Sequence, residues 1–166
     1  MLLSRPVPVV LIRSKASFVT RPSSSTLSHV NPSTNMPTMV DVTLKNVTYR
    51  VAKAKATVKL STEVFNLISR VDRRDEIYSK KGPVFSSAII AGVMAMKKTS
   101  ELIPFCHQVN LDFCDIAIKI DDDEEQSLSV ISIAKTSHKT GVEMEALVGA
   151  TTASLCIYDM LKVRLI

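Results

Sequence analysis

Apolar and polar residues alternate without interruption between residues 52 and 60, and this run constrains the fold more than any other. Alanine, valine and leucine occupy the even positions, while lysine and threonine occupy the odd ones. Successive side chains of a strand point to opposite faces, so the run predicts a β-strand with one buried face and one wet face. A sheet built from such strands needs a cover on one face only.

The segments that follow carry helical signals. Ser61 is suited to cap a helix with one apolar stripe. That stripe consists of Val64, Leu67, Ile68 and Val71. A polar loop over residues 72–82 then leads to Pro83, which fits the first turn of a second helix. We expect this helix to reach about Ile103, because Pro104 stops it.

Two more strands and a last helix complete the pattern. Residues 109–120 alternate in two phases, and the slip near Cys114–Asp115 predicts a bulge. Five consecutive acids, residues 121–125, separate this strand from one over residues 127–135. A metal site is one interpretation of the acids, but a solvated hairpin turn is favoured because nothing forces like charges to converge. With a helix rich in small residues over 141–161, the order predicts an α+β fold, an antiparallel sheet with helices on one face.

The first 38 residues differ from the rest in charge. They are rich in serine and threonine, contain four basic residues and contain no acid. The basic residues are Arg5, Arg13, Lys15 and Arg21. This composition is typical of a mitochondrial or plastid transit peptide. A secretory signal is the alternative because residues 7–12 are largely apolar, yet Pro8 interrupts them. We expect residues 1–38 to be a transit peptide or a disordered extension, with the mitochondrial matrix favoured over plastid or cytoplasm.

The basic segment also accounts for most of the net charge of +5, since only +1 remains after residue 40. A domain so nearly balanced lacks the basic stripe that nucleic-acid binding requires. No run approaches the roughly 20 apolar residues of a membrane helix. Cys106, Cys114 and Cys156 form an odd, sparse set that suits a reducing compartment rather than a disulfide framework.

Two groups of residues contain a lysine that could carry chemistry. Lys81, within the segment 80–83, precedes a helix start, where free N–H groups and the helix dipole favour phosphate. A solvated loop lysine fits the spacing as well, and spacing alone favours it. Asp159 and Lys162 fit a general acid or base beside an orienting carboxylate, or else a surface ion pair.

Two other groups contain a histidine and a pair of carboxylates. His107 opens a strand and fits an acid–base group or a semi-buried histidine. A zinc site is disfavoured there, because Cys106 and His107 would point to opposite faces and no spaced ligand set completes a tetrahedron. Glu143 and Glu145 complement a helix dipole, or alternatively accept hydrogen bonds from a purine-like or pterin-like edge.

Five segments occur in an order that resembles one known family. They are Met39–Val42, Lys81–Phe85, Leu102–His107, Lys139–Leu147 and Ile157–Met160. The chain resembles the MoaC family, the cyclic pyranopterin monophosphate synthases of molybdenum cofactor biosynthesis, over residues 39–162. Its most specific block reads Lys-Thr-Gly-Val-Glu-Met-Glu. Residues 39–166 are therefore expected to be a MoaC-like catalytic domain.

The resemblance implies a ferredoxin-like α+β subunit in a hexamer, a trimer of dimers. It implies a lyase that converts a cyclised dihydro-GTP nucleotide into cyclic pyranopterin monophosphate and pyrophosphate. No cofactor is required by this reaction, although Mg²⁺ could accompany the triphosphate, and no metal ligands are implied. Asp159, Lys162 and Lys81 match the family's catalytic residues. Its substrate-binding segments match Phe105, Cys106, His107, Glu143, Met144 and Glu145.

Two expectations concern how such a site works. A partly desolvated lysine can have its pKa lowered toward neutrality and so exchange protons. Glu143 and Asp159 are 16 positions apart, about 24 Å along one helix at roughly 1.5 Å per residue. One small substrate cannot touch both ends, so we expect each site to pair the Glu143–Glu145 end of one subunit with the Asp159–Lys162 end of another.

The chain departs from the family pattern at its C-terminal end. Family members continue with a last strand and a lysine-containing tail, whereas only residues 163–166 follow Lys162. We therefore expect a truncated last strand, an open sheet edge and a less stable, weakly active or inactive enzyme. The alternatives are a non-catalytic nucleotide-binding or regulatory subunit of the same family and a purely structural interaction module.

Overall fold

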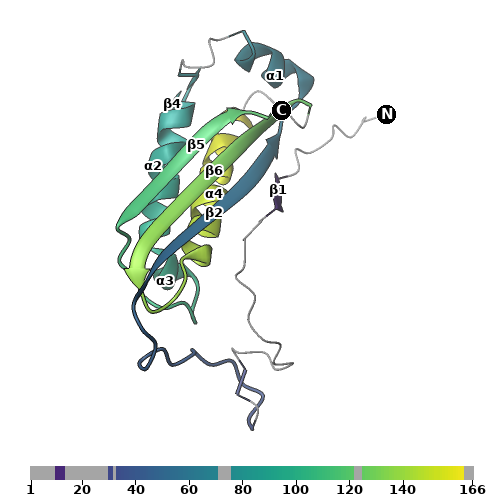
Figure 1. Cartoon of the computed structure of the whole chain (residues 1–166). Coiled ribbons are helices and arrows are strands. Elements are labelled where there is room, and N and C mark those ends of the chain that lie inside the picture. The colour runs from purple at the N-terminus through teal and green to yellow at the C-terminus, as the bar shows by residue number, and fades with distance from the viewer. Residues whose placement is uncertain (1–9, 14–29, 32, 71–75, 122–124, 163–166) are drawn as a thin grey trace.

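A four-stranded antiparallel sheet carries two long helices on one face (Figure 1), in a computed structural model that describes residues 10–13, 30–31, 33–70, 76–121 and 125–162. The sheet order is β1-β2-β6-β5, with β1 at Val10–Arg13, β2 at Thr48–Lys59, β6 at Ser127–His138 and β5 at Phe113–Ile120. The helices are α1 Thr62–Ile68, α2 Val84–Lys97, α3 Thr99–Leu102 and α4 Glu143–Leu161. A small hairpin of β3 (Tyr78–Ser79) and β4 (Gly82–Pro83) precedes α2. The predicted α+β architecture is confirmed.

The alternating run lies in β2, as predicted, although the strand begins four residues earlier at Thr48. Ala54, Ala56 and Val58 are buried on the face that α2 and α4 cover. β2 pairs with β6 along its whole length, from Thr48 opposite His138 to Lys59 opposite Ser127. The two central strands therefore supply the floor of the core.

Helix α1 begins at the predicted cap. The Ser61 side chain accepts a hydrogen bond of 3.4 Å from the backbone N–H of Val64. Val64 and Ile68 are buried, but Leu67 is 41% exposed, so the predicted stripe is narrower than four residues. The helix has only seven residues, and Val64 and Ile68 are the buried ones among them. Val71 lies outside the described residues.

The prediction of one continuous helix from Pro83 to Ile103 is wrong. Helix α2 ends at Lys97, and the four-residue helix α3 follows after Lys98, whose φ of −113° leaves the helical range. The buried Thr99 hydroxyl donates to the carbonyls of Ala95 and Met96. Threonine side chains that bond back to carbonyls one turn earlier compete with helix continuation, which explains the break.

The predicted bulge near Cys114 is also wrong. β5 pairs with β6 one residue to one residue, from Phe113 opposite Lys135 to Ile120 opposite Leu128. The change of phase falls where the strand begins, just after Asp112, whose backbone N–H donates 2.9 Å to the carbonyl of Lys135, the residue opposite Phe113. Side chains also hold residues 110–112 against β6. Asp112, for example, accepts a hydrogen bond of 2.8 Å from the Ser137 backbone N–H.

Small residues let α2 and α4 pack very closely. A Cβ added to Gly92 would lie 2.9 Å from the backbone oxygen of Gly149, and one added to Gly149 would lie 2.5 Å from Cγ of Met96. The two helices therefore approach each other closely through these small residues. This contact fixes the position of α4, which carries most candidate residues.

The turn between β5 and β6 was expected to be solvated, but its first residue is buried. Asp121 is 7% exposed and its carboxylate lies 2.9 Å from the ammonium of Lys55. Residues 122–124 lie outside the described residues. Within the described ranges, no group of three or more histidine, cysteine, aspartate or glutamate residues could hold a metal ion.

Strand β1 lies within the segment expected to be a leader. It pairs antiparallel with β2, from Val10 opposite Val58 to Arg13 opposite Lys55. β1 therefore covers part of the sheet edge formed by β2. Residues 163–166, where the truncated strand was expected, lie outside the described residues. Among the described helices, none is long and apolar enough to cross a membrane.

Candidate active site

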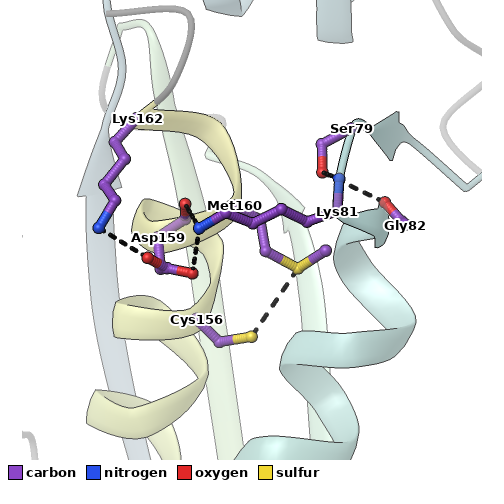
Figure 2. A network of polar contacts seen from close by, with 7 residues as sticks. All are labelled: Ser79, Lys81, Gly82, Cys156, Asp159, Met160 and Lys162. Carbon is purple, nitrogen blue, oxygen red and sulfur yellow. Dashed lines mark hydrogen bonds and ion pairs between the residues drawn. The ribbon is translucent and has the colours of Figure 1, made fainter.

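One carboxylate holds two ammonium groups where the β3–β4 hairpin meets the end of α4 (Figure 2). Asp159 lies 2.7 Å from the Lys81 ammonium through Oδ2 and 2.7 Å from the Lys162 ammonium through Oδ1. Lys81 also donates a hydrogen bond of 3.0 Å to the backbone carbonyl of Asp159. The three side chains remain 41–51% exposed, so a ligand could reach all of them. The structure thus brings together the three residues predicted to be catalytic.

Hydrogen bonds from Lys162 and then Lys81 lower the pKa of Asp159 from an ordinary 3.8 to about 2. The hydrogen bond with Asp159 in turn raises the pKa of Lys162. The lowered lysine pKa expected from the sequence is therefore wrong for Lys162, because the partner carboxylate outweighs desolvation. Asp159 and Lys162 both stay charged at neutral pH.

The β3–β4 hairpin presents Lys81 through a tight turn. Gly82 has a φ of +112°, which side chains rarely adopt, so glycine is required there. The Ser79 hydroxyl accepts a hydrogen bond of 3.1 Å from the Lys81 backbone N–H and donates one of 3.4 Å to the Gly82 carbonyl (Figure 2). The short turn aims Lys81 across at α4, which lies far away in the sequence.

The start of α2 is already occupied by a carboxylate from this chain. Glu76 accepts hydrogen bonds of 2.8 Å from the backbone N–H groups of Phe85 and Ser86. One of the two interpretations of the sequence had these N–H groups free for phosphate, whereas Glu76 accepts hydrogen bonds from them. A phosphate contact in this region would therefore come from the lysine side chains of the hairpin, Lys80 and Lys81. Glu76 escaped notice because nine residues separate it from Phe85, far from the usual capping spacing.

The second group of predicted residues lies near the start of α4. Cys106 belongs to a turn after α3, closed by its N–H bonding to Ile103, rather than to the predicted opening of a strand. His107 Nε2 lies 2.7 Å from the Val40 carbonyl, which can only accept, so the histidine donates. Phe105 is exposed on the same turn. The segment near residue 40 therefore lies against this turn near the start of α4. The spacing of residues in the sequence did not indicate this contact.

Glu145 is the buried carboxylate of this group. It is 4% exposed, and burial followed by the nearby charge of Glu143 raises its pKa. The pKa of the Cys106 thiol is raised by burial and by Glu145, so both groups lie in one environment. Glu143 and Met144 are exposed, and the Glu143 carboxylate folds over Gly141, where a Cβ would overlap it. A buried acid near exposed polar groups is a frequent mark of a functional site.

Within one chain the two groups stay apart. Helix α4 runs unbroken from Glu143 to Leu161, so its first-turn carboxylates and Asp159 are separated by about 24 Å at roughly 1.5 Å per residue. The expectation that one small ligand cannot span both ends of one subunit agrees with this geometry.

Comparison with known proteins identifies the family of this chain. The MoaC family model matches residues 39–164. A protein of Helicobacter pylori named "Cyclic pyranopterin monophosphate synthase" is 44% identical over 82% of this chain and 82% of its own length. One of the same name from Clostridium perfringens is 48% identical over 75% of this chain and 74% of its own. "Molybdenum cofactor biosynthesis protein 1" of Dictyostelium discoideum is 44% identical over 81% of this chain but only 23% of its own length. With a family match over most of its length and relatives this similar, the chain belongs to the MoaC family.

Proposed function

We propose that this chain is a lyase of molybdenum cofactor biosynthesis that makes cyclic pyranopterin monophosphate. The reaction converts a cyclised dihydro-GTP nucleotide and releases pyrophosphate. The observation that carries the proposal is the contact of Lys81 and Lys162 with one carboxylate, Asp159. The similar bacterial proteins that carry the synthase name support the same reaction.

The charges of this cluster suit the release of pyrophosphate. Two ammonium groups around one carboxylate leave a surplus of positive charge at an exposed position. Preorganised cations stabilise the negative charge that develops on the leaving pyrophosphate without further reorganisation. The raised pKa of Lys162 makes it a protonated donor in this state, so its role is that of an acid rather than a base.

The buried acid at the other end of α4 suits the ring system of the substrate. A carboxylate can accept from adjacent ring N–H and amino groups, and a protonated carboxyl can also donate. Because burial raises its pKa, Glu145 keeps the protonated, donating form to a higher pH than an ordinary glutamate does. His107, Cys106 and Phe105 would line the same end.

We further propose that each complete site is shared between two subunits of a hexamer. The support is the 24 Å separation along α4, about 16 residues at roughly 1.5 Å each. Glu145→Ala and Asp159→Ala subunits, each inactive alone, should regain activity when mixed, since one arrangement of the pair rebuilds an intact site. Verified mixed oligomers without activity would contradict shared sites.

A pyrophosphate-release assay tests the reaction. The purified chain, supplied with the cyclised dihydro-GTP nucleotide with and without Mg²⁺, should release pyrophosphate. Lys81→Ala and Lys162→Ala should lose most of that release, while Lys97→Ala, an exposed lysine at the far end of α2, should keep it. Binding of nucleotide without turnover by the unaltered chain would instead identify a non-catalytic subunit.

We also propose that residues 1–38 direct the chain to the mitochondrial matrix. Their basic, hydroxyl-rich and acid-free composition supports this. Fusion of residues 1–38 to a fluorescent protein should produce mitochondrial fluorescence, and Arg5→Glu with Arg13→Glu should abolish it. Plastid or cytoplasmic fluorescence from the unaltered fusion would contradict the proposal.

A further inference from the structure

The loop that carries Lys81 is closed by a carboxylate at its base. Glu76 Oε1 accepts hydrogen bonds of 2.8 Å from the N–H groups of Ile77 and Phe85. Its Oε2 accepts one of 2.8 Å from the Ser86 N–H and one of 2.5 Å from the Ser86 hydroxyl. Glu76 therefore links Ile77, just before the β3–β4 hairpin, to the first turn of α2, the helix that follows the hairpin.

These contacts satisfy every donor at the start of α2. Pro83 has no N–H, the Val84 N–H donates 2.8 Å to the Ile77 carbonyl, and the next two N–H groups bond to Glu76. A carboxylate at this position also complements the helix dipole. Burial alone would raise the pKa of Glu76, but the hydrogen bonds from Ser86, Phe85 and Ile77 outweigh burial and lower it. The Glu76 carboxyl that closes the loop is therefore ionised at neutral pH.

The closed base determines where Lys81 points. The hairpin has only two residues in each strand, too few to hold its own orientation. Ser79 fixes its tip, while Glu76 and the Ile77–Val84 hydrogen bond tie its base to α2. Helix α2 packs against α4, so the base is placed relative to Asp159 through that helix pair. From there the Lys81 ammonium reaches the Asp159 carboxylate at 2.7 Å.

We infer that Glu76 is a positioning residue of the proposed site, which sets the engagement of Lys81 with Asp159 by closing the hairpin onto α2. It need not touch the substrate. Its importance for turnover rests on the proposed function, whereas its control of the Lys81–Asp159 contact does not.

The test measures the pKa of Asp159 by carboxyl NMR titration of the full chain. The unaltered chain should give a value of about 2. Lys81→Ala should raise the pKa of Asp159, because one of the two partners that lower it is lost. The size of this rise is the reference shift. Glu76→Ala should give at least half of that reference shift, and Glu76→Gln a smaller one. Adding Lys81→Ala to Glu76→Ala should move the value only to the reference, since both act through the same contact.

Ser61→Ala is the matched control, because it removes a cap from α1 and leaves the hairpin alone. It should leave the Asp159 pKa unchanged. If Glu76→Ala does not fold, Ser86→Ala removes only the hydroxyl hydrogen bond and should still raise the pKa. A folded Glu76→Ala or Ser86→Ala chain with an unshifted Asp159 pKa overturns the inference.

Pyrophosphate release separates this inference from the proposed function. With an active chain, Glu76→Ala should reduce release roughly as Lys81→Ala does, and more than Ser61→Ala. If the unaltered chain releases none, the proposed reaction fails while the titration result stands. If release is intact in Glu76→Ala but the Asp159 pKa has shifted, Lys81 is not needed for the reaction, and only the positioning inference survives.

Discussion

Replacing Gly149 with alanine tests how closely α2 and α4 pack. The added Cβ would lie 2.5 Å from Cγ and 2.8 Å from Sδ of Met96, and 2.8 Å from the Ser132 hydroxyl. Met96 and Ser132 are fully buried, so neither can move into solvent. Overpacking of this kind costs about 1–3 kcal/mol. Alanine recovers roughly 1 kcal/mol through its higher helix propensity. The net expectation is a loss of about 1 kcal/mol, or roughly 2–4 °C in Tm for a chain of this size.

The assay is equilibrium unfolding in urea at one fixed protein concentration, because assembly shifts apparent stability. Met96→Ala removes the two Met96 contacts and leaves only the Ser132 hydroxyl at 2.8 Å, so Gly149→Ala should cost less in that background than in the unaltered chain. Gly92→Ala is the matched control: its Cβ would meet the Gly149 backbone oxygen at 2.9 Å, which Met96→Ala does not relieve. An equal loss from Gly149→Ala in both backgrounds would refute this account of the packing.

Three further predictions concern single side chains. The pKa of Glu145 is raised in the folded chain, so the stability linked to its proton is present below the unfolded value near 4.5 and is lost as pH rises through the folded value. Glu145→Gln should therefore raise Tm at pH 7 and change it little in acid, while abolishing pyrophosphate release; a lower Tm at pH 7 would contradict this. Asp159→Asn should return the raised pKa of Lys162 toward its ordinary 10.5, followed by NMR titration, and an unchanged value would mean that Asp159 is not its cause. Ser61→Ala should cost roughly 0.5–1 kcal/mol in urea unfolding, since it leaves the Val64 N–H without its cap, and no loss would show that this 3.4 Å contact contributes nothing.

Sequence patterns predicted the elements that bury a periodic face. β2 was predicted because its alternation is regular and its partner buries the same face throughout. α4 was predicted because its small residues recur on one side. The break after Lys97 was missed because it depends on a single threonine hydroxyl that bonds backwards. The phase change near Cys114–Asp115 was interpreted as a bulge because a strand entry and a bulge produce the same pattern in one sequence.

The candidate residues were predictable by type and by family resemblance, but their partners were not. Nothing near Lys81 in the sequence indicates that its ammonium contacts Asp159, 78 positions later. The same holds for His107 and the carbonyl of Val40. Such contacts depend on how helices and loops pack, which periodicity does not encode. Glu76 shows the same limit, because the β3–β4 hairpin brings an acid from nine residues earlier to a helix start.

Helix α4 fixes an angle as well as a length. Each residue of an α-helix turns the chain by roughly 100° about its axis. Loss of one residue between Ala150 and Tyr158 would therefore swing Asp159 and Lys162 more than a quarter turn away from the Lys81 hairpin. Every proposed catalytic side chain would still be present, yet the two lysines could no longer share a carboxylate. Insertions and deletions in this domain should accordingly accumulate in its turns and be purged from this one helix.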